Sequence, residues 1–298
     1  MKLNGLHLLL TYQCTFECDH CFVWGSPWQT GTMTIDMIRI ILRQAIDSGT
    51  VDWIYFEGGE PFLYYQTMLA GINETVEMGF RAGIVTNGYW ATSEEDASLF
   101  LNPLAGKIQD LSISSDLFHY NEKISQQSKF ITKVAEDLHI PMGIITIEQP
   151  ECTAATSMGQ IPQESSSIMY RGRAADVLAP KVVHYPLTAF TSCPYENLID
   201  PGRVHIDPLG HLHICQGISL GNLFQSTLTE ICDGYEPSSH PIIGPILEGG
   251  PYGLALKYHV LEDGAYADAC HLCYETRKRL RDQFPDILLP DQMYMVKN

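Results

Sequence analysis

Apolar and polar residues follow two different periods along the first half of the chain. Short apolar runs are typical of buried strands, and six such runs lie at residues 5–13, 51–59, 81–88, 107–116, 142–148 and 166–174. Segments with helical spacing separate the first five of them. In residues 34–49, Thr34 is placed to cap a helix and Gly49 to end it. Its apolar residues share one helical face: Ile35, Ile38, Leu42 and Ile46.

About six repeats of strand and helix predict parallel strands joined by crossover helices. Six units are too few for a closed eight-stranded barrel, so we expect an α/β fold with a partial, open (β/α)6 barrel. The alternation of strand and helix patterns ends near Ala179, where Pro, Gly and His become frequent. We therefore expect two domains, residues 1–180 and a small cysteine-rich domain in 181–298. In such folds the functional residues gather at the carboxyl ends of the strands.

The composition narrows the range of partners. The 298 residues are 45% hydrophobic and 18% charged, as in a compact globular protein, and the formal net charge is −17. Nucleic acid is an unsuitable partner for this charge, because phosphate backbones are bound by clustered Lys and Arg. No apolar run approaches the ~20 residues that span a bilayer, and the first apolar stretch is too short for a signal peptide. We expect a cytoplasmic protein, in which clustered cysteines indicate metal or redox chemistry.

Three cysteines are crowded into the loop after the first expected strand, at Cys14, Cys18 and Cys21. Three thiolates on one short loop can hold three irons of a cubane cluster and leave the fourth iron open. Zinc sites more often combine two CxxC units to supply four ligands.

The CxxxCxxC motif, followed by "FEGGEP" at the end of the second strand, resembles the radical S-adenosylmethionine (SAM) superfamily. The resemblance covers residues 5 to about 178. It implies a [4Fe–4S] cluster whose open iron binds SAM, and a 5′-deoxyadenosyl radical that abstracts a substrate hydrogen. It also implies a low-potential electron donor such as flavodoxin or ferredoxin. His20 occupies the position before the third cysteine, which is usually aromatic in the family.

The resemblance assigns cofactor-binding positions to the ends of several strands. Gly58, Gly59 and Glu60 match the family's GGE, whose backbone binds the SAM amino group; a plain glycine turn is the alternative. Thr86 and Asn87 end the third strand. The other candidates for the SAM pocket, besides His20, are Ser112, Ser114, Asp116, Arg171 and Arg173. For Asp116 a helix cap is the competing interpretation, and for the two arginines it is a surface salt bridge.

A second set of cysteines lies beyond residue 180: Cys193, Cys215, Cys270 and Cys273. It resembles the "twitch" form of the SPASM extension, which implies four ligands and one fully coordinated auxiliary [4Fe–4S] cluster. Full coordination leaves no iron open to substrate, so an electron-transfer role is implied. A four-thiolate zinc site fits the same spacing.

Two residues near the fifth strand are candidates for chemistry on the substrate. Glu148 shares a strand face with Thr146 that we expect to look into the barrel, so it is a candidate proton acceptor or substrate contact. A pairing with Arg171 is the alternative. Cys152 follows a few residues later, where a thiol can donate a hydrogen atom to a substrate radical. Most unassigned cysteines, however, are small buried hydrophobic residues.

Together these features favour a radical SAM enzyme that oxidises a small molecule or a peptide, by dehydrogenation or cross-linking. Because the chain begins almost at its first strand, we expect no fused leader-peptide domain ahead of it. An epimerase that uses Cys152 as hydrogen donor is the first alternative. A non-catalytic iron–sulfur electron carrier or zinc-stabilised binding module is the second, and it leaves "FEGGEP" and the β-α series unexplained.

Overall fold

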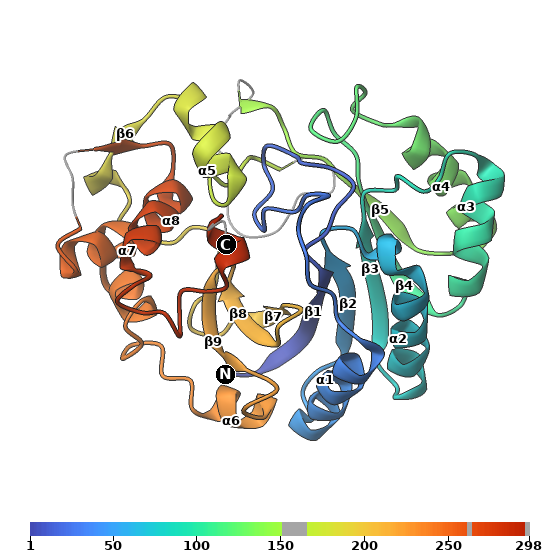
Figure 1. Ribbon diagram of the computed structural model, residues 1–298, viewed down its shortest axis with the longest axis horizontal. Coiled ribbons are helices and arrows are strands. Elements are labelled where there is room, and N and C mark those ends of the chain that lie inside the picture. The colour runs from blue at the N-terminus through green and yellow to red at the C-terminus, as the bar shows by residue number, and fades with distance from the viewer. Residues whose placement is uncertain (151–165, 261–263, 296–298) are drawn as a thin grey trace.

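The computed structural model describes residues 1–150, 166–260 and 264–295, and its main feature is one eight-stranded, mostly parallel sheet (Figure 1). The strand order is β5-β4-β3-β2-β1-β7-β8-β9. The bounds are β1 Leu3–Thr11, β2 Trp53–Gly58, β3 Arg81–Thr86, β4 Ile108–Ser114, β5 Met142–Ile145, β7 Gly202–Ile206, β8 His211–Cys215 and β9 Ile218–Asn222. Strands β1 to β5 and β7 run parallel, and β8 and β9 are added antiparallel. This confirms the expected α/β fold with a mostly parallel sheet.

Four helices pack on one face of the sheet (Figure 1). They are α1 Ile35–Ser48, α2 Tyr65–Glu77, α3 Glu94–Leu101 and α4 Gln126–Asp137. Thr34 caps α1, since its side chain accepts from the Met37 amide, and Gly49 ends the helix in the left-handed conformation, both as predicted. Between these helices and the strands lies the larger apolar core, built from alternate residues of β1 such as Leu6 and Leu8. The other face of the sheet is thereby left to form the inside of the open barrel.

Two expectations from the apolar pattern were wrong in detail. Residues 166–174 do not form a sixth strand; the pairing there is a single bridge between Ile147 and Ser166. In α1, Ile46 is 49% exposed, whereas Ile41 and Ala45 are buried. The buried stripe is therefore Ile38, Ile41, Leu42 and Ala45, because packing on β1 and β2 selects a face rotated from the one with most isoleucines.

The C-terminal half continues the same sheet and adds helices beside its end. Besides α5 Arg173–Val177 and the two-residue strands β6 Tyr185–Pro186 and β10 Ala265–Tyr266, it contains α6 Leu228–Asp233, α7 Ile243–Lys257 and α8 Ala269–Leu280. A second apolar core joins Leu9 and Tyr12 of the first part to residues of β8, α7 and α8. The expected domain boundary falls in a 3-10 helix, Ala179–Lys181, and remains a prediction. Within the described ranges, no helix is long and apolar enough to cross a membrane.

Candidate functional site

The first cysteine loop follows the carboxyl end of β1 and is fixed by backbone and side-chain contacts. The Gly25 amide donates to Cys21 Sγ (3.1 Å), the Phe16 amide to Cys14 Sγ (3.5 Å), and Asn87 Nδ2 lies 3.6 Å from Cys14 Sγ. Amides directed at cysteine sulfurs stabilise thiolates, and they are one of the ways in which a protein tunes an iron–sulfur cluster.

Two thiols of this loop, those of Cys14 and Cys18, ionise with difficulty unless a cation is present. Burial, together with the nearby Glu60 and Cys21, raises the pKa of Cys14 to about 12. Burial and the two other thiols also raise the pKa of Cys18. A coordinating metal reverses this preference by deprotonating the thiols. The loop therefore concentrates groups that become favourable ligands only when a positively charged centre joins them.

Arg173 holds the loop in place from inside the protein. Its buried guanidinium donates to the Cys18 carbonyl and to the Gly25 carbonyl, each at 2.8 Å, and its own amide donates to the Cys21 carbonyl at 2.9 Å. The guanidinium also lies 5.4 Å from the Trp24 ring. Arg173 is therefore buried and does not form the surface salt bridge that was the alternative interpretation. Its contact with SAM remains a prediction, and its observed role is to position the loop.

The glycine pair of "FEGGEP" packs directly against the same loop. The Gly59 amide donates to the Thr11 carbonyl (2.6 Å) and the Glu60 amide to the Gln13 carbonyl (2.8 Å). A Cβ on Gly59 would stand 2.0 Å from the Gln13 oxygen, and Gly58 has a φ of 134°. The two glycines are therefore required by the fold itself, whatever they bind.

The Glu60 side chain ties the ends of β2 and β3 together. It is fully buried; Oε1 accepts from the Phe62 amide (3.0 Å) and the Thr86 hydroxyl (2.8 Å), and Oε2 accepts from the Asn87 amide (2.8 Å). Burial raises its pKa to about 7 in spite of these donors. The motif residues Glu60, Thr86 and Asn87 are thus brought together as the sequence predicted.

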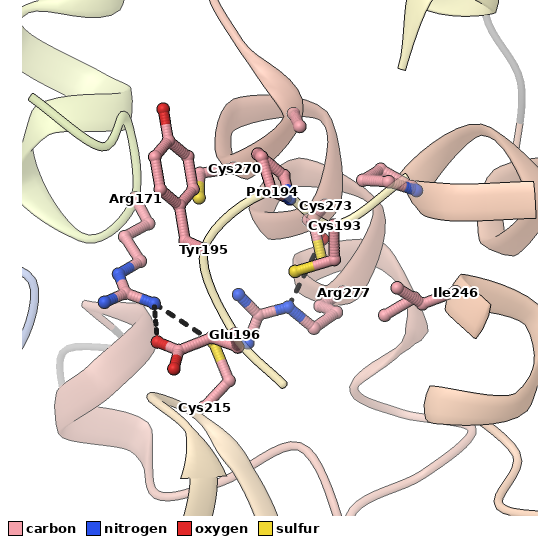
Figure 2. Close-up of a pocket in the computed structure, with 12 residues that line it drawn as sticks. Arg171, Cys193, Pro194, Tyr195, Glu196, Cys215, Ile246, Cys270, Cys273 and Arg277 are labelled. Atoms are coloured by element: carbon pink, nitrogen blue, oxygen red, sulfur yellow. Dashed lines mark hydrogen bonds and ion pairs between the residues drawn. The ribbon is translucent and has the colours of Figure 1, made fainter. Parts of the chain in front are cut away.

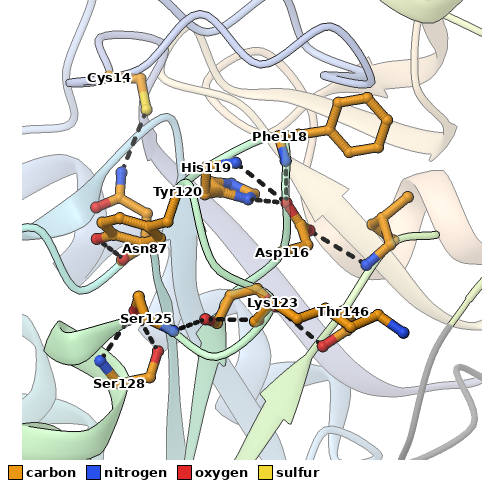
Figure 3. Close-up of polar contacts among 12 residues, drawn as sticks. Cys14, Asn87, Asp116, Phe118, His119, Tyr120, Lys123, Ser125, Ser128 and Thr146 are labelled. Atoms are coloured by element: carbon orange, nitrogen blue, oxygen red, sulfur yellow. Dashed lines mark hydrogen bonds and ion pairs between the residues drawn. The ribbon is translucent and has the colours of Figure 1, made fainter. Parts of the chain in front are cut away.

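A turn after β4 presents a further group of polar side chains (Figure 3). Asp116 accepts from the amides of Phe118 (2.9 Å), His119 (3.1 Å) and Ile147 (3.1 Å), and the His119 ring lies 2.8 Å away. Burial opposes its ionisation, but His119 and these donors outweigh burial and lower the pKa. Asp116 thus stabilises its own turn and not a helix, because Ser125 caps α4. Ser112 donates to Asp110 (3.1 Å).

These elements line a pocket at the carboxyl ends of the strands, whose space of about 680 Å³ includes part of the solvent at its mouth. Its lining includes the three loop cysteines and His20, together with Gly58, Gly59, Thr86, Asn87 and Ser114. Burial and the neighbouring His119 lower the pKa of His20 to about 4, so its imidazole is neutral. Six of the predicted cofactor residues thus gather here from four separate segments, whereas the pocket lining does not include Glu60, Ser112, Asp116 or Arg173.

The second cysteine set lines a separate pocket of about 360 Å³, drawn in Figure 2. Cys270 and Cys273 come from α8, Cys215 ends β8, and Cys193 lies in the loop before β7. Burial raises the pKa of Cys193, Cys270 and Cys273, that of Cys273 to about 11. The four residues that the spacing grouped are therefore neighbours in space, although 80 positions separate the first from the last.

Two buried arginines stand among these thiols (Figure 2). Arg171 Nη1 lies 3.2 Å from both Glu196 Oε1 and Cys215 Sγ. Arg277 is 1% exposed; its guanidinium donates to the Gln216 carbonyl (2.7 Å) and the Cys273 carbonyl (3.3 Å). The resemblance placed Arg171 at the SAM pocket, and the structure places it here instead. Buried cations are retained where they compensate negative charge, which thiolate ligands supply.

The two residues proposed for substrate chemistry have different outcomes. Cys152 lies outside the described residues. The Glu148 amide donates to the Ser166 carbonyl (3.0 Å), and Arg171, its suggested partner, pairs with Glu196. The proton-acceptor role of Glu148 stays a prediction. The other unassigned cysteine, Cys232, packs in the larger apolar core as a small hydrophobic residue.

Sequence reasoning missed a polar group beneath the first pocket, formed by His7, Glu57 and His205. His7 and Glu57 stand at alternate positions of apolar strands, a signal that their side chains face away from the helices. No local signal indicates that His205 joins them, because that depends on β7 pairing with β1 across nearly 200 residues.

Comparison with known proteins supports the resemblance for part of the chain. Residues 8–115 match the family model described as the Radical SAM superfamily, which is a superfamily of enzymes. An S-adenosylmethionine-dependent nucleotide dehydratase of Selenomonas ruminantium is 32% identical over 117 residues, 37% of this chain and 38% of that protein. The putative peptide biosynthesis protein YydG of Bacillus subtilis is 27% identical over 111 residues, 37% and 35% of the two chains. The chain thus spans less than two fifths of either relative.

Two solved structures share the fold over most of the chain. BtrN in complex with AdoMet and 2-DOIA has a TM-score of 0.52 at 16% identity, covering 78% of this chain and 82% of its own. Native anSMEcpe with bound AdoMet also has a TM-score of 0.52, at 13% identity, covering 94% and 97%. At these identities the likeness establishes the fold alone. The superfamily's cofactors are SAM and a [4Fe–4S] cluster.

Proposed function

We propose that this chain is a radical SAM oxidoreductase with two iron–sulfur sites, acting on a small molecule or a peptide. The observation that carries the proposal is that the two cysteine sets line two separate pockets. The first lines a pocket at the carboxyl ends of the strands, and the second surrounds a smaller pocket with two buried arginines.

The first pocket fits the cofactors of the superfamily. Cys14, Cys18 and Cys21 would hold a [4Fe–4S] cluster, with sulfur-directed amides and Arg173 keeping their loop rigid. When bound, the cluster and SAM supply a 5′-deoxyadenosyl radical that abstracts a hydrogen atom from the substrate. Gly58 and Gly59 keep the backbone within reach of a ligand, and the neutral His20 adds a polar wall without charge. A low-potential donor such as flavodoxin or ferredoxin would provide the electron.

The second pocket fits an auxiliary [4Fe–4S] cluster of the twitch type, held by Cys193, Cys215, Cys270 and Cys273. A cluster with four thiolate ligands carries net negative charge in the protein interior, which Arg171 and Arg277 would offset. Oxidation of a substrate releases two electrons, and this site would accept the second one. Residues 181–298 would then be the auxiliary domain, in a cytoplasmic enzyme. A zinc ion held by the same cysteines is the competing occupant.

Epimerisation of a peptide is the second candidate reaction. The similarity to a putative peptide biosynthesis protein favours a peptide as the substrate. In that reaction Cys152 would return a hydrogen atom to the substrate carbon, with no net oxidation. Cys152→Ala would then abolish the product, whereas a dehydrogenase would tolerate the change. Deuterium incorporated from solvent at a product carbon would likewise indicate epimerisation.

Reductive cleavage of SAM tests the proposal before any substrate is known. The reconstituted protein, SAM and dithionite are incubated without oxygen, and 5′-deoxyadenosine is quantified by mass spectrometry. We expect product from the native protein and none from Cys18→Ala. Cys232→Ala, which removes a thiol from the apolar core, is the matched control and should retain cleavage. Equal product from Cys18→Ala, or none from the fully iron-loaded native protein, would refute the proposal.

A further inference from the structure

Three polar side chains meet on the barrel face of neighbouring strands. His7 belongs to β1, Glu57 to β2 and His205 to β7, and β1 lies between the other two. The register places His7 opposite His205 and Leu9 opposite Glu57. Their neighbours in sequence, such as Phe56 and Ile206, face the helices in the apolar core. The three polar side chains therefore converge on the opposite face, inside the barrel.

The contacts among the three residues are short but poorly directed. Glu57 Oε2 lies 3.3 Å from His7 Nδ1, and Glu57 Oε1 lies 3.0 Å from His205 Nε2. One ligand atom from each residue lies within 4.8 Å of those of the other two. Yet His7 Nδ1 and Glu57 Oε1 are buried and have no hydrogen bond of acceptable geometry. A buried polar atom without a well-directed partner costs up to about 1–3 kcal/mol, and a bound group that contacts these atoms would remove that cost.

These spacings suit a single metal ion that takes one nitrogen from each histidine and the carboxylate of Glu57. Bonds of about 2.0–2.2 Å to nitrogen and oxygen, at angles between octahedral and tetrahedral, separate two ligand atoms by about 3.0–3.4 Å. The two contacts, each to a different oxygen of Glu57, lie in that range. Two imidazoles and one carboxylate are the donors that zinc and non-haem iron prefer, whereas magnesium and calcium prefer oxygen donors alone. The Tyr55 ring, stacked on His7 at 4.6 Å, fixes the orientation of that imidazole.

We propose that His7, Glu57 and His205 bind one divalent first-row transition metal ion, in addition to the two iron–sulfur sites. Glu57 directly precedes Gly58 and lines the pocket of the first cysteine set. Three protein ligands leave at least one coordination position open, as in catalytic metal sites. Because Glu57 lines this pocket, an open position would be available to a hydroxyl or carboxylate oxygen of a substrate bound there.

Metal analysis of the cluster-loaded protein tests this inference, with Zn²⁺ as the probe. After equilibration with Zn²⁺ and desalting, zinc, iron and acid-labile sulfide are measured per chain. We expect one zinc that no sulfide accompanies. Glu57→Gln and His205→Gln should each weaken its binding at least 100-fold in a competition titration with a chelator, and leave iron and sulfide unchanged. His139→Asn, which changes an exposed histidine in the turn that follows α4, is the control and should keep the zinc.

A second readout covers variants that fail to fold. Co²⁺ added to the native protein should produce absorption in the visible region typical of a nitrogen- and oxygen-ligated ion, above the cluster spectrum, and Zn²⁺ should displace it. The inference is overturned if the native protein takes up no extra zinc, or if both glutamine variants bind it as tightly as the native protein. The three residues would then be a polar cluster held by the ion pairs of Glu57 with the two histidines. Either result leaves the SAM-cleavage test of the main proposal untouched, because no iron ligand is changed.

Discussion

Gly59→Ala isolates what the glycine pair contributes to the fold. Gly59, unlike Gly58, has a backbone conformation open to any residue, so alanine adds only a methyl group. That methyl would lie 2.0 Å from the Gln13 oxygen and 2.8 Å from the Tyr12 oxygen. Both neighbours are backbone atoms, which no side-chain rotation can move aside. The loop that carries the first cysteines must therefore shift by about 1 Å or more to restore an ordinary contact.

The cost of this shift follows from the contacts that it disturbs. Two backbone hydrogen bonds join the glycine segment to the loop, from Gly59 to Thr11 and from Glu60 to Gln13. Losing them costs about 0.5–1.5 kcal/mol each, and overpacking adds about 1–3 kcal/mol, so destabilisation should total about 2–6 kcal/mol. With an unfolding entropy of about 0.6 kcal/mol/K for a chain of this length, the Tm should fall by about 3–10 °C.

The assay is thermal unfolding of the cluster-free protein, measured by circular dichroism without SAM. Gly143→Ala is the matched control, because a Cβ there meets no atom within 4 Å. Gly143 belongs to β5 of the same sheet. We expect its Tm to stay within about 1 °C of the native value. An unchanged Tm for Gly59→Ala would refute the reasoning and leave close approach to SAM as the sole reason for the glycine.

Three further predictions concern buried charges. Arg173→Met removes both guanidinium hydrogen bonds to the cysteine loop, so a chelator should remove iron from the first site at least 10-fold faster. Visible absorption follows the loss, and equal rates for variant and native protein would show that Arg173 does not hold the loop in place. Arg171→Gln should lower the reduction potential of the second site, since a buried positive charge near the thiolates is gone, and redox titration monitored by electron paramagnetic resonance measures the shift. For Glu60, a folded pKa of about 7 lies above its unfolded value, so its stabilising contribution is present at low pH and is lost as pH rises through 7. Between pH 5 and pH 8, the unfolding free energy of Glu60→Gln should therefore rise relative to that of the native protein by on the order of 2–3 kcal/mol. A difference that stays constant with pH would show that the pKa of the Glu60 carboxyl is not raised.

The sequence indicated local features well and long-range contacts poorly. The caps of α1 and the positions of five parallel strands depend on nearby residues, and these were predicted correctly. The first cysteine set could be grouped because its spacing is a local pattern, whereas the second set, which spans 80 positions, was grouped by its resemblance to the twitch form. The addition of β7 to β1, and with it the meeting of His205 and Glu57, depends on a pairing that no periodicity encodes. Arg171 was assigned to the wrong pocket for the same reason, since its partners Glu196 and Cys215 come from later segments.

The central claim, two iron–sulfur sites of which one is the SAM site, is tested most directly by counting iron and sulfide. The protein is reconstituted without oxygen, and both are measured per chain for the native form and for a variant in which Cys14, Cys18 and Cys21 are all alanine. The account predicts about eight irons and eight sulfides in the native protein, falling to about four of each in the variant. About four irons falling to none, with zinc at the second site, would contradict it and leave a single-cluster enzyme with a structural metal.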